Sequence, residues 1–90
     1  GDLFGLGVIL YELLADELPF SGRSVAAVLA AITRGQPRPL REAAPHVPRE
    51  VSDLVMRLIA HDKADRPADA TVVAEELAAL ERRFAGPDRR

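Results

Sequence analysis

The sequence feature that most constrains the fold is a nearly uninterrupted apolar run at residues 2–14, D-L-F-G-L-G-V-I-L-Y-E-L-L. No proline interrupts it, and Asp2 stands where a carboxylate would accept hydrogen bonds from the free N–H groups of a first helical turn. Leucines cover one side of such a helix, and most of the other side is also apolar. A surface helix keeps a polar face, whereas this one has only Glu12 and two glycines. We therefore predict a helix that is surrounded on nearly all sides.

The composition is that of one small soluble domain. The 90 residues are 48% hydrophobic and 29% charged, which is typical of globular rather than disordered chains. The absence of cysteine excludes a disulfide framework, a thiolate metal site and a cysteine nucleophile, and it favours a cytoplasmic location. A net charge of −2 lacks the basic excess on which nonspecific nucleic-acid binding depends. We expect no nucleic-acid partner.

The start of the chain predicts neither a membrane span nor a signal peptide in this segment. The run at residues 2–14 contains Glu12 and is shorter than the roughly twenty apolar residues that a bilayer requires. A signal peptide would begin with a basic segment, and this chain begins with Gly-Asp. Since it also lacks an initiator methionine, we expect it to begin within a longer protein, for which membrane anchoring beyond Arg90 is left open.

Three further helices are predicted downstream. Ser24 caps one that runs to about Arg34, and residues 35–47, with three of the seven prolines, form an extended connector. Pro48 suits the first position of the next helix, and Asp69 caps the last one after a charged turn. We expect the last two helices to end near Ala60 or His61 and at Gly86-Pro87, respectively.

The prediction is therefore an all-α fold of four helices, the first of them central. Enclosing a nearly all-apolar helix with three amphipathic ones is difficult, because small domains bury only about 60% of their unfolded surface. Either the chain associates with itself or it belongs to a larger domain, and we favour the second explanation.

Two motifs stand in a fixed order in the chain. Residues 2–14 are followed by Leu18-Pro19-Phe20, and a second motif, L-I-A-H-D-K-A-D-R-P, extends from Leu58 to Pro67. In this order and at this spacing they resemble the C-terminal part of the C-lobe of a protein kinase domain, most like bacterial serine/threonine kinases. The family patterns read D-x-W-S-x-G-x-x-L-Y-E-L and L-x-x-D-P-x-x-R-P. The resemblance covers residues 1–84 and leaves 85–90 as a charged tail or linker.

The resemblance implies supporting roles for five residues. Asp2 matches the aspartate that receives hydrogen bonds from the catalytic-loop backbone. Ile9 and Leu13 match apolar positions that support the residues beneath the adenine. Arg66 matches the arginine that pairs with a glutamate closing the activation segment, and Glu12 lies where some kinases bind a basic substrate residue.

Four positions depart from the family pattern without touching its chemistry. Phe4 replaces a tryptophan, Gly5 a serine, Asp16 a glycine and Lys63 a proline. More consequential is the lack of a glycine-rich loop, H-R-D or D-F-G in this sequence, since phosphoryl transfer needs these elements and a strand lysine. We predict no catalytic, cofactor-binding or metal-binding residue here. ATP and Mg²⁺ belong to the parent kinase, whose partners would be protein substrates and the missing remainder of the domain.

The resulting hypothesis is a fragment of an ATP-dependent serine/threonine protein kinase that is not catalytic alone. It would support the catalytic loop, while the second and third helices with their connector would carry much of the substrate-docking surface. The alternative is a non-catalytic helical interaction module that dimerises or binds a partner. A helix-turn-helix DNA reader is disfavoured, because its recognition helix would begin with the acidic segment A-D-A-T-V-V-A-E-E.

Several residues also have simpler structural explanations. Arg66 can form a solvated charge pair with Asp62, Asp65 or Asp69. Gly5 and Gly7 are explained by close packing against a neighbour, and both histidines by exposure at the surface.

Overall fold

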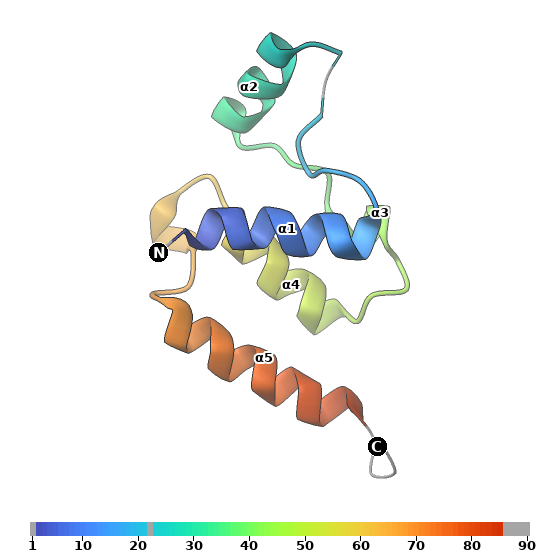
Figure 1. Cartoon of the computed structure of the whole chain (residues 1–90), viewed down its shortest axis with the longest axis vertical. Helices are drawn as coiled ribbons and strands as arrows, with labels where there is room; N and C mark the ends of the chain where they lie inside the picture. Colours follow the sequence, from blue (N-terminus) through green and yellow to red (C-terminus); the bar gives the residue numbers. More distant parts are fainter. Residues whose placement is uncertain (1, 22, 86–90) are drawn as a thin grey trace.

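The computed structural model describes residues 2–21 and 23–85, and every regular element in these ranges is helical. The elements are α1 (Leu3–Ala15), α2 (Val25–Arg34), α3 (Leu40–Ala43), α4 (Arg49–Leu58), the 3₁₀ helix η1 (Lys63–Asp65) and α5 (Ala70–Ala85). In Figure 1, α1, α4 and α5 form the body of the molecule, and α2 stands apart from it. The all-α prediction is confirmed. The predicted helix end at Gly86-Pro87 and residues 86–90 of the predicted tail lie outside the described ranges.

The predicted cap at the start of α1 is confirmed, and Asp16 ends the helix. The Asp2 carboxylate accepts a hydrogen bond of 2.8 Å from the Gly5 N–H, which satisfies one of the free donors of the first turn. At the other end Asp16 adopts φ 57°, and its N–H donates to the Glu12 carbonyl. Aspartate tolerates this left-handed conformation better than most residues, so it ends the helix where glycine is more usual.

The core lies between α1 and α4. A Cβ added to Gly7 would lie 2.6 Å from the Leu58 Cβ and 2.7 Å from the Ile59 Cγ2, so glycine allows the two helices to approach closely. Tyr11, Leu58 and Ile59 are fully buried, and Val55 is nearly so. The predicted apolar stripe of α4 therefore packs against one side of α1, and close packing explains Gly7.

The connector at 35–47 was predicted to be extended, and this prediction is wrong for its central part. Residues Leu40–Ala43 form one helical turn, α3, which makes five α-helices in the described ranges. Leu40 is fully buried and Ala44 almost fully buried against the α1/α4 core. Burial of these two apolar residues, four positions apart, stabilises a turn that is too short to give a periodic sequence signal.

The boundaries of α4 also differ from the prediction. Pro48 is the residue before the helix rather than its first residue, and the helix ends at Leu58, before the expected 60–61. The Ile59 backbone, with φ −98° and ψ 12°, has left helical geometry so that the chain can turn toward η1.

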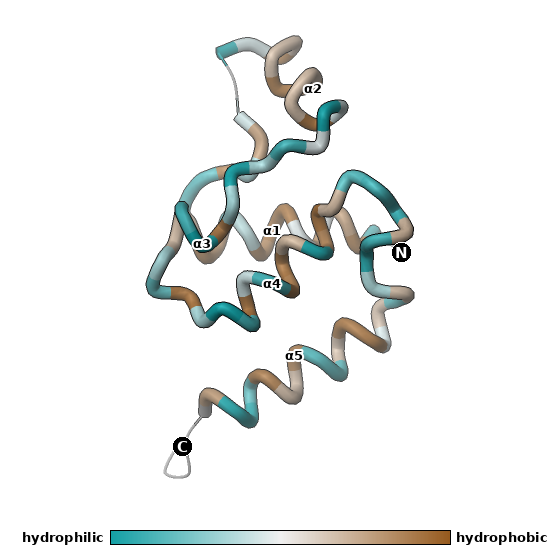
Figure 2. Tube along the Cα trace, turned by 180° about the vertical axis from the view of Figure 1, so that it is seen from behind, coloured by the Kyte–Doolittle hydropathy of each residue, from teal (hydrophilic) through white to brown (hydrophobic). Residues whose placement is uncertain are grey.

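Two ion pairs connect α5 to α4. Arg57 Nη2 lies 2.7 Å from a Glu76 carboxylate oxygen, and Arg83 Nη1 lies 2.9 Å from one of Glu50. Val73 is the buried apolar residue of α5 within its described part. Figure 2 shows the hydrophobic positions alternating with polar ones along this helix. The predicted cap is confirmed, since the Asp69 carboxylate accepts from the Val72 N–H at 3.0 Å.

The residues that the structure describes do not enclose α1 on nearly all sides. Ile9 remains 57% exposed and Leu13 75% exposed, on the side of the helix that α4 does not cover.

Candidate functional site

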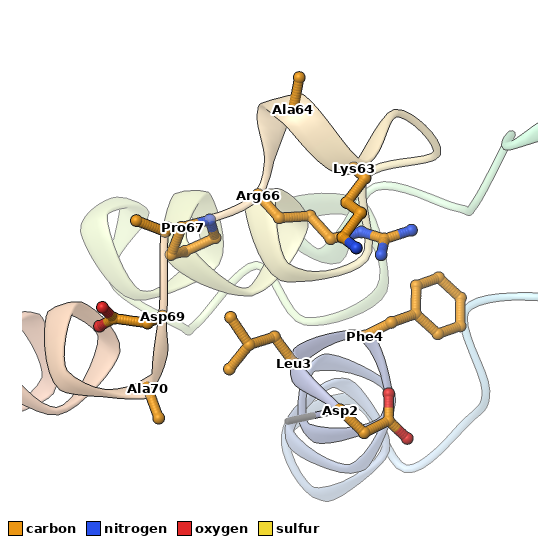
Figure 3. A pocket seen from close by; sticks show the side chains of 10 residues that line it. Asp2, Leu3, Phe4, Lys63, Ala64, Arg66, Pro67, Asp69 and Ala70 are labelled. Carbon is orange, nitrogen blue, oxygen red and sulfur yellow. The ribbon is translucent and has the colours of Figure 1, made fainter.

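An open cleft of about 720 Å³ lies at the N-terminal end of α1. The cap residue Asp2 and Phe4 of the first turn of α1 line it, as do Lys63, Arg66 and Asp69 from the segment between α4 and α5. Figure 3 shows these side chains around the cleft. Of the five residues assigned from the sequence, the fold thus places Asp2 and Arg66 beside the same cavity.

Arg66 is half-buried and fixed in orientation by uncharged partners. Its Nε donates to the Ala60 carbonyl at 2.9 Å, and its Nη2 donates to the His61 carbonyl at 3.4 Å. The guanidinium lies over the Phe4 ring, 5.1 Å from the centroid, which is a favourable cation–π geometry. A guanidinium carries five N–H groups, so this arrangement leaves donors for a further acceptor such as a carboxylate.

The charge pair between Arg66 and a neighbouring aspartate, which would have been the simpler explanation of this residue, is not observed in the described structure. Among the described residues, no carboxylate of Asp62, Asp65 or Asp69 forms an ion pair with it. Two of these aspartates act as caps: Asp62 accepts from the Ala64 N–H at 2.9 Å, and Asp69 caps α5. The guanidinium is therefore positioned by the fold rather than by a neighbouring charge.

Phe4 connects the cleft to the loop that follows α1. Its ring stacks on that of Phe20, with centroids 6.0 Å apart and planes inclined by 24°. Pro19 and Phe20 are buried, so this segment packs back onto the core. The Pro-Phe motif therefore stabilises the aromatic ring over which Arg66 lies.

Asp2 is exposed, and only one of its carboxylate oxygens has a hydrogen-bond partner in the described structure. Oδ1 accepts from the Gly5 N–H, whereas Oδ2 lies where a side chain at position 5 would begin. A Cβ on Gly5 would be 2.3 Å from Oδ2, so the missing side chain accommodates the carboxylate. Gly5 thus packs against its own helix cap rather than against another element. The second oxygen is available to a donor from outside the chain.

The other three residues selected by the family resemblance lie together on a surface that we call the outer face of α1: Ile9, Glu12 and Leu13. All three are exposed, and their spacing of three and four residues puts them on one side of the helix. Neither apolar member contributes to the buried core clusters. The fold thus separates the assigned residues into a cleft pair and an outer-face group.

Sequence reasoning missed a cluster that we call the neck, formed by Tyr11, Glu17, Pro19 and Arg38. The Tyr11 hydroxyl donates to the Arg38 carbonyl at 2.6 Å, and the Arg38 N–H donates to the Pro19 carbonyl at 3.1 Å. Arg38 Nη1 lies 3.0 and 3.1 Å from the two Glu17 carboxylate oxygens. These bonds connect the two chain segments that lead into and out of α2.

The environment of the neck affects Tyr11 directly. Burial raises the pKa of its hydroxyl above the ordinary value of 10.0, and the Glu17 carboxylate raises it further, while Arg38 opposes the rise. The sequence contained one signal for the part that Tyr11 plays in the neck. A tyrosine within an apolar run has a hydroxyl that needs a hydrogen-bond partner when it is buried.

His46 and His61 are exposed, as expected. Over the described ranges, no group of three or more histidine, cysteine, aspartate or glutamate side chains is arranged to hold a metal ion. Gly35, with φ 65°, ends α2 directly beside His61.

Within the described ranges, none of the helices has both the length and the apolar content needed to cross a bilayer.

Comparison with known proteins shows similarity to parts of protein kinases. Over 76 residues, or 84% of this chain, the sequence is 38% identical to tyrosine-protein kinase MasK of Myxococcus xanthus. It is 40% identical over 80 residues, or 87% of the chain, to serine/threonine-protein kinase pkn2 of the same species. With serine/threonine-protein kinase PknL of Mycobacterium tuberculosis the identity is 30% over 87 residues, or 97% of the chain.

The matched segment is a small part of each relative. The chain spans 12% of MasK, 10% of pkn2 and 22% of PknL. No protein-family model matches the chain. The relatives include proteins named for serine/threonine and for tyrosine phosphorylation, so their names agree on the kinase family and not on the acceptor residue.

Proposed function

We propose, from the premise that this chain belongs to the protein kinase family as a C-terminal part of the C-lobe, that α1 supports the catalytic loop in the complete protein. The parent would be an ATP-dependent serine/threonine kinase acting on protein substrates. The chain by itself would be non-catalytic. Its role would be to provide the hydrophobic base on which the catalytic segments rest.

The observation that carries this proposal is the outer face of α1. The most apolar helix of the chain is packed on one side by α4, while Ile9 and Leu13 on the other side are 57% and 75% exposed. Leaving apolar side chains in water forgoes about 25 cal/mol for each Å² that a partner would bury. The missing remainder of the domain is the partner that we infer, with Ile9 and Leu13 beneath the nucleotide-binding residues.

The cleft supports the same proposal at the N-terminal end of α1. Asp2 offers its Oδ2 to backbone donors of the catalytic loop, and Arg66 offers N–H groups to the glutamate that closes the activation segment. Both partners would come from outside this chain. Glu12, exposed next to Leu13, is a candidate for binding a basic substrate residue.

The test uses the complete kinase with Leu13→Ser, and Leu77→Ser on α5 as the matched control. We expect Leu13→Ser to lower kcat and to increase hydrogen exchange in the catalytic loop, because its support is lost. Leu77→Ser, which lies outside the outer face, should leave both quantities near wild type. Unchanged kcat and catalytic-loop exchange in Leu13→Ser would refute the supporting role.

ATP and Mg²⁺ are proposed to bind only to the complete kinase, because this chain carries none of the nucleotide-binding motifs. Calorimetric titration of the chain with Mg-ATP should show no saturable heat, and saturable binding would contradict the proposal.

The second candidate is a non-catalytic helical module that binds a partner or a second copy. Exposed apolar residues on α2 and α5 favour it, namely Val25, Leu29 and Phe84. Sedimentation of the chain separates the candidates: a concentration-dependent dimer supports the module, and a monomer supports the kinase fragment.

A further inference from the structure

Lys63 is the only lysine of the chain, and it stands where the kinase pattern has proline. The proposed function gives it no role. The fold places it at the cleft beside the N-terminal end of α1, which Arg66 also lines. Figure 3 shows both side chains at this cleft. Lys63 is exposed, and it forms no ion pair with any described residue.

A single 3₁₀ turn brings Lys63 and Arg66 to the same side of the chain. The Asp62 carboxylate caps η1 by accepting from the Ala64 N–H at 2.9 Å, and the Arg66 N–H donates to the Lys63 carbonyl at 3.2 Å. Residues three apart in a 3₁₀ helix eclipse one another, so these two side chains leave the backbone in similar directions. The cleft thus receives two cationic groups from one short turn.

The carboxylates that also line the cleft do not neutralise these cations. Asp2 and Asp69 cap α1 and α5, where they accept from the N–H groups of Gly5 and Val72. The partial positive charge at a helix N-terminus offsets the charge of such a carboxylate. Neither aspartate forms an ion pair with Lys63 or Arg66 in the described structure.

Both cations retain hydrogen-bond donors for a ligand. Arg66 uses its Nε and Nη2 on two backbone carbonyls, which leaves Nη1. The Lys63 ammonium has three N–H groups, and none of them contacts a described acceptor closely enough for a hydrogen bond. One carboxylate can engage one of these cations, so a ligand that satisfies both needs two acidic groups.

We propose that this cleft binds an extended acidic segment with two carboxylates, one on Arg66 and the other on the Lys63 ammonium. The pairing of Arg66 with the glutamate that closes the activation segment belongs to the proposed function, and the origin of the bound segment rests on it. The second carboxylate, selected by Lys63, is the new element. In the complete kinase the segment at this cleft therefore carries a second acidic residue close to that glutamate.

The chain offers a substitution that removes the Lys63 charge and keeps the turn. The Lys63 N–H donates to no described acceptor, so a proline there loses no hydrogen bond. Asp62 has φ −80° and ψ 121°, which a residue before proline readily adopts. Lys63→Pro should therefore preserve η1 and the position of Arg66. Arg41→Gln is the matched control, because Arg41 is exposed on α3 and does not line the cleft.

The experiment measures fluorescence anisotropy of short labelled peptides that are titrated with the chain. One probe has a single central glutamate, and the others carry a second glutamate at successive positions on either side of it. We expect one of the two-glutamate probes to bind about threefold more tightly than the single-glutamate probe, which is the range of an exposed ion pair. Added salt should reduce this gain.

Variants assign the two carboxylates to their cations. Lys63→Pro should abolish the gain from the second glutamate and leave binding of the single-glutamate probe unchanged, whereas Arg41→Gln should change neither. Arg66→Gln should weaken binding of both probes. Lys63→Glu should transfer the preference to a probe with lysine at the second position. Far-UV circular dichroism and thermal melts establish that each variant is folded.

Covalent coupling gives an independent readout, because Lys63 is the only lysine. Treatment of the complex with a carbodiimide should join the second glutamate to the Lys63 Nζ as an amide, with release of the carbodiimide as a urea. Mass spectrometry of the digested product locates the bond. Coupling to Lys63 that is equally efficient with the single-glutamate probe would contradict the assignment.

The inference is overturned if no position of the second glutamate improves binding, or if the improvement persists in Lys63→Pro. Binding that depends on Arg66 and not on Lys63 would overturn it and leave the proposed pairing of Arg66 intact. The proposed support of the catalytic loop is read from Leu13→Ser in the complete kinase, so its failure and a failure here are separate results.

Discussion

The two sides of α1 are both largely apolar and have opposite environments. On the inner side, Gly7 and Tyr11 are buried against α4, and the helices are close enough that one added methyl group would clash. On the outer side, Ile9 and Leu13 are 57% and 75% exposed. Hydropathy does not distinguish the sides, because it measures how much a residue gains from burial and not whether a partner is present.

The proposed kinase fragment predicts this difference, because α1 would then be a helix of a larger domain. The inner side is packed against α4 at Gly7, and the buried Tyr11 hydroxyl has a hydrogen-bond acceptor. The outer side is apolar, and no described residue buries it.

The largest effect is expected from a pair of leucine truncations. Leu58→Ala should lower the free energy of unfolding by about 3 kcal/mol, because it leaves a cavity between α1 and α4. Leu13→Ala should change it by less than about 0.5 kcal/mol, because its side chain is 75% exposed in this chain. Urea unfolding followed by circular dichroism measures both. Similar losses in the two variants would show that the outer side is covered in solution.

A smaller effect is expected from the two glycines of α1. In Gly7→Ala the new Cβ meets Leu58 and Ile59, so overpacking of about 1–3 kcal/mol should exceed the helix-propensity gain of about 1 kcal/mol. In Gly5→Ala the Cβ meets only the Asp2 carboxylate, which can turn away. Loss of this cap should then roughly cancel the gain in propensity. Greater stability of Gly7→Ala in the same denaturation assay would contradict the close α1–α4 contact.

Tyr11→Phe tests the buried hydroxyl of the inner side. Its loss leaves the Arg38 carbonyl without this partner and should cost about 1 kcal/mol of unfolding free energy. Because the pKa of Tyr11 is raised in the folded state, the folded chain retains the proton at pH values where the unfolded chain loses it. Stability from this group is therefore complete below pH 10.0 and falls as pH rises toward the folded pKa.

Tyr11 is the only tyrosine, so ultraviolet absorbance follows its ionisation without interference from another phenol. Denaturation at pH values above 10.0 should show a decline that is absent from Tyr11→Phe. Equal pH dependence of the two proteins, or ionisation of Tyr11 at its ordinary pKa, would argue against the buried hydrogen bond.

Much of the fold was predictable because its signals act over a few residues. Asp2, Ser24 and Asp69 accept the cap bonds expected of them, and Asp16 and Gly35 end their helices in the left-handed conformation. The interior turn α3 was not predictable, because a single turn depends on burial of Leu40 rather than on local propensity.

The candidate site was predictable in its residues more than in its geometry. Sequence resemblance selected Asp2 and Arg66, and the fold places both beside one cleft. It did not indicate that Phe4 lies under the guanidinium or that Phe20 stacks on Phe4. The roles of Asp2 and Arg66 in a complete kinase stay predictions. The same holds for Ile9, Glu12 and Leu13.

The sequence of residues 2–14 was sufficient to predict a helix and its cap, because caps and periodicity act within a few residues. It also predicted an apolar surface that is too extensive for a surface helix. Packing between distant segments of the chain decided which side of that helix is buried. Leu58 of α4 and the following residue Ile59 reach α1 at Gly7, and no described segment covers Ile9 and Leu13. Burial requires atoms from elsewhere in the chain, so only the folded arrangement distinguishes the packed side from the open one.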